Sequence, residues 1–168
     1  ELKNRENTAR IADAMLGNEE LSAFCKALLP ELMARTDSNM GAVYFLQEEK
    51  KRFEPYYAIG LTRDKMRPFS AEANEGEFGV ALARKQITRT SAIPDDSIFD
   101  FATVAGSFKP KEIITIPVVQ LEKVIAMISL ASLHAYSEEA AAIINGSWKS
   151  LNMGVIGMLA FENTQDYS

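Results

Sequence analysis

The sequence is poor in the side chains that most often carry out chemistry in small proteins. Its 168 residues include one cysteine, Cys25, and one histidine, His134. A single cysteine excludes an internal disulfide and a zinc cage built from several thiolates, and it fits a reducing compartment. One histidine cannot make a histidine-rich metal site, and no Ser/His/Asp or Cys/His constellation can be assembled around it. We therefore expect no metal site.

Basic clusters and long apolar runs are also scarce. The chain has 18 Lys and Arg against 23 Asp and Glu, a net charge of −5, and its only basic cluster is Lys50-Lys51-Arg52. A nucleic-acid partner is therefore disfavoured. No apolar stretch approaches the roughly 20 residues that span a bilayer, and no signal peptide is visible. These absences predict a cytoplasmic protein without a membrane segment.

With 47% hydrophobic residues, the chain is expected to form one globular domain that buries its own core. Residues 1–17 are polar with a narrow apolar stripe, which indicates a linker helix that enters from upstream. The domain proper is predicted at 18–162, and 163–168 begin a C-terminal linker. Because the chain starts at Glu1 and ends in a polar helical pattern, we expect it to be part of a longer protein.

The stretch 111–132 organises the predicted fold. It contains two β-branched apolar runs separated by a short polar link, a pattern typical of a hairpin. The runs lack polar alternation, so both faces of this central pair should be covered. The predicted class is α+β: an antiparallel sheet of five to six strands, long N- and C-terminal helices on one face, and a loop and short-helix pocket on the other. Further strands are expected at 40–46, 53–59, 66–69 and 87–91, and further helices at 1–16, 21–32, 75–85 and 137–162.

The segment 92–110 is the longest predicted connection. Connections of more than about 15 residues within a compact domain are often binding loops. Phe99 and Phe101 in this loop either fill the core, the favoured interpretation, or contact a ligand. Asp95 and Asp96 are better explained by a turn than by metal binding, because adjacent side chains point apart and no further ligand is evident.

The last predicted helix carries two apolar stripes. Three glycines within it, Gly146, Gly154 and Gly157, cost about 1 kcal/mol each relative to alanine and so indicate close approach by a neighbour. That neighbour is either the N-terminal helix of the same chain or the same helix of a second copy. The candidate positions for a helix-mediated dimer are Gly146, Met153, Gly154, Gly157 and Ala160.

Several short motifs point together to a known family. In chain order they are Gly41-Ala42-Val43-Tyr44, Glu75-Gly76-Glu77-Phe78-Gly79-Val80-Ala81, Gly106-Ser107-Phe108-Lys109-Pro110, Pro117, Leu130-Ala131-Ser132 and Tyr136-Ser137-Glu138-Glu139. With these motifs and its order of elements, the chain resembles a GAF domain, a relative of PAS sensor modules. The resemblance covers residues 19 to 162 and is greatest to the GAF domains that precede the kinase core in bacterial hybrid sensor histidine kinases.

The resemblance implies a regulatory sensor or dimerisation module that is not itself an enzyme. It implies a homodimer through the terminal helices, a C-terminal kinase output domain, and a pocket for an unidentified small molecule. Covalent bilin attachment is not expected, because Cys25 does not match the cysteine through which bilin-binding GAF domains attach their chromophore. A methionine sulfoxide reductase of this fold would need several cysteines. The candidate pocket residues, each of which also fits a core position, are Tyr57, Phe69, Phe78, Phe99, Phe101, Thr115 and Ser129.

Two rival hypotheses remain open at this point. The first is a small-molecule enzyme that uses carboxylates as acid and base; its candidates are Glu75, Glu77, Asp95 and Asp96. The second is a degenerate GAF domain that only dimerises. Glu75 and Glu77 would repel a phosphate, so the Gly76-x-x-Gly79 spacing indicates a tight turn and not a phosphate cradle.

Overall fold

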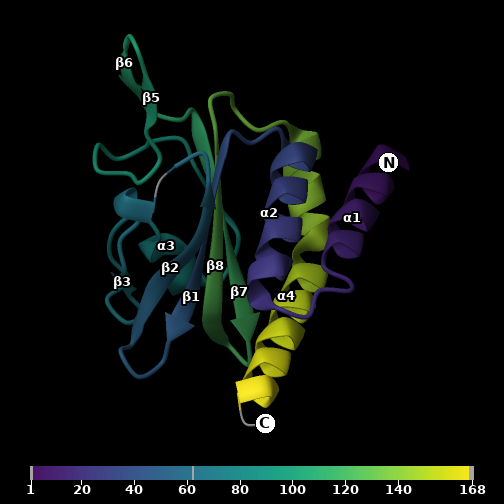
Figure 1. Cartoon of the computed structure of the whole chain (residues 1–168). Coiled ribbons are helices and arrows are strands. Elements are labelled where there is room, and N and C mark those ends of the chain that lie inside the picture. The colour runs from purple at the N-terminus through teal and green to yellow at the C-terminus, as the bar shows by residue number, and fades with distance from the viewer. Residues whose placement is uncertain (1, 62, 167–168) are drawn as a thin grey trace.

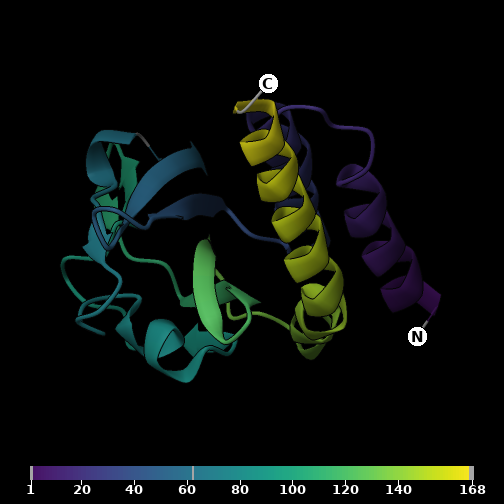
Figure 2. The same cartoon turned by 90° about the horizontal axis from the view of Figure 1, so that it is seen from below.

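The computed structural model describes residues 2–61 and 63–166 and confirms the α+β class (Figure 1). Six strands form one antiparallel sheet in the order β3-β2-β1-β8-β7-β4. The long helices α2 and α4 cover one face, and α3 lies with the loops over the other (Figures 1 and 2). The elements are α1 (Leu2–Ala14), α2 (Leu21–Thr36), β1 (Met40–Gln47), β2 (Arg52–Ile59), η1 (Arg63–Lys65), β3 (Phe69–Ser70), α3 (Gly79–Arg84), β4 (Thr88–Thr90), β5 (Phe101–Thr103), β6 (Gly106–Phe108), β7 (Glu112–Gln120), β8 (Lys123–Ser132) and α4 (Glu138–Asp166).

The predicted hairpin forms the interior pair β7 and β8, and side chains on both of its faces are buried. Ile114 and Ile116 belong to the core between the sheet and the helices, the helix-side core. Ile113 and Met127 belong to a second core on the opposite face, the pocket-side core. Successive side chains of a strand alternate between faces. A strand sandwiched between two cores therefore has to be apolar at nearly every position, which is why the sequence lacks alternation here.

Three elements differ from the sequence predictions. The third strand is Phe69–Ser70 and does not begin at Met66, and the short helix α3 begins only at Gly79. The segment 92–110 is not a plain loop, because it contains the β5–β6 hairpin, which projects from the body of the domain (Figure 1). Its turn is held by Thr103, whose hydroxyl donates to the Gly106 carbonyl at 2.9 Å and accepts from the Ala105 N–H at 3.2 Å. Strands of three residues are too short to give a detectable period.

The helix α1 packs against α4 and α2 on the side away from the sheet (Figure 2). A Cβ added at Gly154 would lie 2.4 Å from Met15 Sδ, and one at Gly146 would lie 3.6 Å from Thr8 Cγ2. The N-terminal helix of the same chain is therefore the neighbour at these two glycines. A Cβ at Gly157 would meet nothing within 4 Å.

Specific hydrogen bonds attach α4 to the rest of the domain. Trp148 Nε1 donates to the Pro117 carbonyl at 2.7 Å, and Asn152 Oδ1 accepts from the Val119 N–H at 3.0 Å, beside an irregularity in the β7–β8 pairing. Near its C-terminal end, Glu162 Oε1 accepts from the Leu21 N–H at 2.8 Å and so satisfies a free donor at the start of α2. Side chains of α4 are thus bonded directly to the backbone of β7. Among the described residues, no helix combines the length and the apolarity that crossing a bilayer demands.

Candidate functional site

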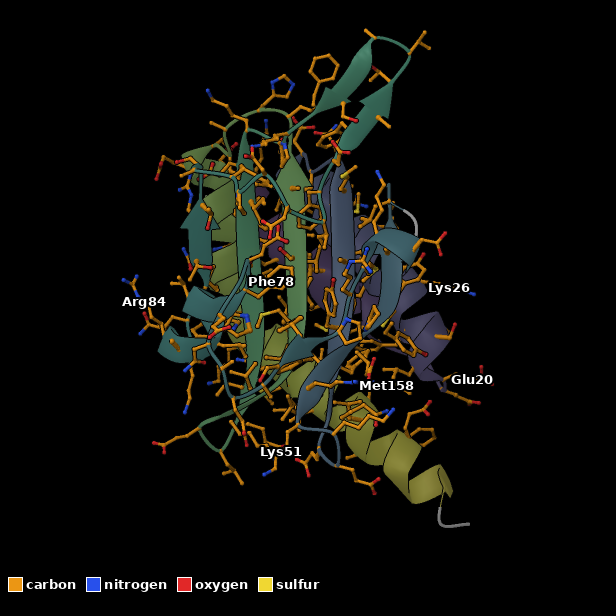
Figure 3. All side chains as sticks on the ribbon, turned by 90° about the vertical axis from the view of Figure 1, so that its left-hand side faces the viewer. Glu20, Lys26, Lys51, Phe78, Arg84 and Met158 are labelled. Carbon is orange, nitrogen blue, oxygen red and sulfur yellow. The ribbon has the colours of Figure 1, made fainter. Side chains whose placement is uncertain are left out.

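A hollow of about 510 Å³ opens on the pocket-side face of the sheet. We call it the Tyr44 cavity. Its walls come from β1, from the chain between η1 and β3, from the turn before α3, and from the loop before β5. Figure 3 looks onto this face, where Phe78 lies in front of the central strands. The lining residues are Tyr44, Lys65, Arg67, Pro68, Phe69, Glu75, Gly76, Glu77, Phe78, Asp96, Ser97, Ile98 and Asp100.

Aromatic rings form the apolar wall of the cavity. The ring centroids of Tyr44 and Phe69 are 5.0 Å apart in an edge arrangement, those of Tyr44 and Phe78 are 5.4 Å apart, and those of Phe69 and Phe78 are 5.0 Å apart. Phe53 stacks on Phe69 from behind, also at 5.0 Å. These distances are typical of favourable aromatic pairs. The wall is therefore rigid, because each ring is held by at least one other.

Tyr44 brings an unsatisfied hydroxyl to this wall. Its side chain is 0% exposed, and its oxygen has no hydrogen-bond partner of acceptable geometry among the described residues. Burial, followed by the charge of Glu77, raises the pKa of Tyr44, and the nearby backbone N–H of Arg67 opposes the shift. An N–H can serve only as a donor, so the proton of the hydroxyl still lacks an acceptor. Such an orphan group costs about 1–3 kcal/mol.

Glu77 is the half-buried carboxylate of the cavity. Its Oε1 accepts from the Ser97 hydroxyl, and its Oε2 accepts from the Ile98 N–H at 3.1 Å. Burial is the main cause that raises the pKa of Glu77; the two hydrogen bonds lower it, and the charge of Asp96 raises it further. Glu77 thus fastens the loop before β5 to the turn before α3. It also places negative charge beside the Tyr44 hydroxyl.

The remaining charged residues lie nearer the solvent. Lys65 Nζ is 3.6 Å from Asp100 Oδ2 and forms an ion pair at the mouth of the cavity. Arg67, Glu75 and Asp96 are exposed. The lining therefore has four carboxylates against two cationic side chains. In the described part of the chain, no group of three or more His, Cys, Asp or Glu side chains is placed to hold a metal ion.

The predicted pocket residues are only partly brought together. Phe69 and Phe78 line the cavity, whereas Phe99 and Phe101 pack into the pocket-side core. Thr115 and Ser129 are buried and bond to each other at 2.9 Å, so their polar groups are already satisfied. The assignment of Tyr57 to the pocket needs correction, because its side chain packs against the helix-side core. A bulge between Val43 and Tyr44 shifts the register opposite Tyr57, which strand periodicity alone does not reveal.

The carboxylates considered for acid–base chemistry also separate. Glu75, Glu77 and Asp96 line the cavity. Asp95 is not among the lining residues and instead forms an ion pair with Lys109, which lowers the pKa of Asp95. Sequence reasoning missed Tyr44, Lys65, Arg67 and Ser97. A tyrosine inside a buried strand was the available signal for the first of these, because its hydroxyl needs a partner.

A second hollow of about 520 Å³ lies on the same face near the β1–β2 and β7–β8 turns. Two of its three lysines are paired, since Lys51 Nζ is 3.6 Å from Glu72 Oε1 and Lys123 bonds to Glu48. None of the described residues that line it has a buried polar atom without a partner. The Tyr44 cavity is therefore the stronger candidate.

Comparison with solved structures identifies the fold. No family model matches the sequence, and no curated protein sequence matches it. The chain superposes on the GAF domain of an Acinetobacter phosphoenolpyruvate-protein phosphotransferase with 15% identity, a TM-score of 0.74, and coverage of 95% of this chain and 97% of that one. The corresponding domain from Coxiella burnetii gives 11% identity, a TM-score of 0.75, and coverage of 99% and 98%.

A third neighbour is a free methionine-R-sulfoxide reductase from Neisseria meningitidis, solved in complex with its substrate. It has 15% identity, a TM-score of 0.72, and coverage of 94% of this chain and 90% of that chain. The prediction that the domain itself is not an enzyme is contradicted by this finding, because the same fold supports catalysis in that protein. A further solved neighbour is a segment of a methyl-accepting chemotaxis protein, with 12% identity, a TM-score of 0.64, and coverage of 88% of this chain and 96% of that one. The chain therefore has the GAF fold.

Proposed function

We propose that this domain is a regulatory sensor that binds a small molecule in the Tyr44 cavity. The observation that carries the proposal is Tyr44, a residue of the cavity lining whose hydroxyl is fully buried and has no acceptor for its proton among the described residues. A ligand that accepts this proton would remove the cost of the orphan group. The volume of about 510 Å³ suits a small metabolite, and the aromatic wall supplies the apolar surface typical of such pockets.

The attachment of α4 supports a route for the signal. A ligand that moves β1 and its neighbours in the sheet also moves β7, and α4 is bonded to β7 through Trp148 and Asn152. We propose that α4 passes this shift to a C-terminal output domain as a rotation or change of register. The motifs at 41–44, 75–81 and 106–110 favour a bacterial sensor histidine kinase as the parent protein, with this domain in the cytoplasm and acting as a homodimer through its terminal helices.

The compound that co-purifies with the natively folded domain tests this proposal. Unbiased mass spectrometry should detect one compound in the wild type and in Tyr57→Phe, a matched control on the opposite face of the sheet. The same compound should be lost or strongly depleted in Tyr44→Phe. Equal retention by Tyr44→Phe would contradict the assignment of the site. A domain that arrives empty and is not stabilised by any compound of a metabolite library would favour the rival in which the domain only dimerises.

Glu77 favours a second candidate function, acid–base catalysis in the same cavity. Its pKa is raised by burial, and a carboxyl group that titrates closer to neutral pH is better suited to proton transfer. Cysteine chemistry is not available there, because Cys25 is buried in the helix-side core and burial raises the pKa of its thiol to about 12. Incubation of the co-purified compound with the domain, followed by NMR, separates the two functions. A catalyst converts the compound and loses turnover in Glu77→Gln, whereas a sensor returns it unchanged.

A further inference from the structure

We infer that the Tyr44 cavity takes an organic cation, specifically a protonated amine that carries an oxygen acceptor next to its nitrogen and an aromatic or apolar body. An amino alcohol with an aromatic group is the simplest member of this class. The inference rests on the proposed function, since it names the chemistry of the ligand in the same cavity. Three features carry it: the aromatic wall, the balance of charge and the Tyr44 hydroxyl.

The aromatic wall provides the first condition. Tyr44, Phe69 and Phe78 lie within 5.0–5.4 Å of one another and line the same hollow. Ring faces carry negative electrostatic potential, so they attract ammonium groups in addition to burying apolar surface. An anion gains only the apolar part of this interaction. The wall alone therefore already favours a cation over an anion of the same shape.

The balance of charge provides the second condition. Lys65 is neutralised by Asp100 at 3.6 Å, and Arg67 is exposed, where solvent screens its charge. Glu77 is only partly exposed. Its charge raises the pKa of Tyr44, and the charge of Asp96 in turn raises the pKa of Glu77. A carboxylate has about four lone-pair sites, and Ser97 and Ile98 donate one hydrogen bond each to Glu77. Glu77 can therefore also accept from an ammonium group.

The Tyr44 hydroxyl provides the third condition and narrows the class. Its proton has no acceptor among the described residues, so a ligand that fills the cavity should offer an oxygen to it. Tyr44 and Glu77 line the same hollow, so one small ligand can reach both only if its nitrogen and its oxygen lie close together. A metal ion would not fit, because the described side chains include no group of three metal ligands. A phosphate or carboxylate ligand would be repelled by Glu77 and Asp96.

Three probes of matched size test the inference by calorimetry. L-phenylalaninol is a cation with a neighbouring hydroxyl, 3-phenyl-1,2-propanediol replaces its amine by a neutral hydroxyl, and 3-phenylpropanoate is an anion. We expect L-phenylalaninol to bind at least tenfold more tightly than either of the others. Glu77→Gln should weaken its binding at least tenfold and bring it level with the diol. Tyr44→Phe should weaken it about fivefold, the effect of losing one neutral hydrogen bond.

Two further variants show whether a loss of affinity reflects a lost charge in the cavity or a change in folding. Asp96→Asn leaves the contacts of Glu77 in place and should weaken L-phenylalaninol about two- to threefold. Glu72→Gln removes an exposed carboxylate that lines the other hollow, and it should have no effect. All variants are compared at equal helicity by circular dichroism. If Asp96→Asn and a folded Glu77→Gln both bind L-phenylalaninol with the affinity of the wild type, the inference is overturned.

The outcomes separate this inference from the proposed function. If 3-phenylpropanoate or the diol binds as tightly as L-phenylalaninol, or if the co-purified compound is neutral or anionic, the assignment of a cation is wrong while the sensor remains. If no probe binds and the domain carries no compound, both proposals fail. A cationic co-purified compound that is displaced by L-phenylalaninol would support both.

Discussion

Two carboxylates of this domain are shifted in opposite directions by their surroundings. Burial raises the pKa of Glu77 in the cavity. Hydrogen bonds from Arg89 are the main cause that lowers the pKa of Glu112, whose oxygens accept from Arg89 Nε at 2.8 Å and Nη2 at 3.1 Å. Glu112 also accepts from the Tyr136 N–H at 2.7 Å. Burial disfavours the charged form of Glu77, so a cationic ligand would stabilise it. Glu112 already accepts hydrogen bonds that join β4, β7 and the approach to α4.

Glu112→Gln should destabilise the domain by about 1.5 kcal/mol at neutral pH, the lower end for hydrogen bonds to charged groups because Arg89 is partly exposed. The folded pKa is depressed, so this contribution is present above the unfolded value, close to 4.5, and is lost as pH falls through the folded pKa. Urea unfolding at pH 7 and at pH 3 measures the difference. An equally large penalty at both pH values would show that ionisation of Glu112 is not what stabilises the fold.

Glu77→Gln should change the pH dependence of stability in the opposite sense. The folded state keeps the proton of Glu77 at a pH where the unfolded chain, with a value close to 4.5, has lost it. The wild type therefore loses stability as pH rises from the unfolded pKa to the folded one, and the glutamine variant lacks this loss. The melting temperature of the variant minus that of the wild type, both measured without ligand, should increase from pH 4 to pH 8. Parallel curves would contradict the buried charge at Glu77.

Among the helices and strands, α4 is the element that contacts the sheet, α2 and α1 together. It bonds to β7 through Trp148 and Asn152 and to the start of α2 through Glu162, and it carries α1 on its outer side. Glu162 is polar because it serves as an acceptor for the Leu21 N–H. Glu162 thus takes part in the packing of α4 against α2 although it is polar.

Gly154→Leu and Gly157→Leu form a matched pair on α4. Both remove a helix glycine, a change that favours the helix by up to about 1 kcal/mol. At 154 the new side chain meets Met15, 2.4 Å from the Cβ position, so it should force α1 away and cost about 1–3 kcal/mol. At 157 a Cβ meets nothing within 4 Å and the fold should keep its stability. Hydrogen exchange of the α1 amides should accelerate only in Gly154→Leu; equal protection in both variants would show that α1 is not seated there.

At the scale of the whole molecule, one sheet separates two tasks. Its pocket-side face holds the cavity, and its helix-side face holds α2 and α4 (Figures 1 and 3). Met153 and Phe161 on α4 remain 66% and 43% exposed after α1 has packed. Under the two proposals, ligand binding and association of copies would concern opposite faces of the same six-stranded sheet.

If the domain dimerises through its terminal helices as proposed, Met153→Asp should weaken the dimer at least tenfold in sedimentation equilibrium, because it places a charge in an apolar contact. Val104→Asp is the control: Val104 is fully exposed in the turn of the β5–β6 hairpin, which projects from the body of the domain away from α4 (Figure 1). Equal association of both variants would remove α4 from the interface. A wild type that stays monomeric at high concentration would contradict the dimer itself.

The sheet, its two-sided burial and the long helices could be predicted from the sequence, because these features depend on apolar periodicity and on short motifs. Residues 111–132 are apolar on both faces whatever surrounds them, and the stripe of α2 follows from helical spacing alone. The β5–β6 hairpin escaped prediction because its strands are too short to show a period.

Which side chains share a site could not be predicted, because it depends on how distant segments pack together. A bulge beside Tyr44 sends Tyr57 to the helices, and the chain between η1 and β3 brings Arg67 next to a strand far away in the sequence. Whether Glu77 is solvated or half-buried depends on Ser97 and Ile98, which reach it from another loop. Burial and hydrogen-bond satisfaction are properties of groups brought together in space, and no local pattern in the chain records them.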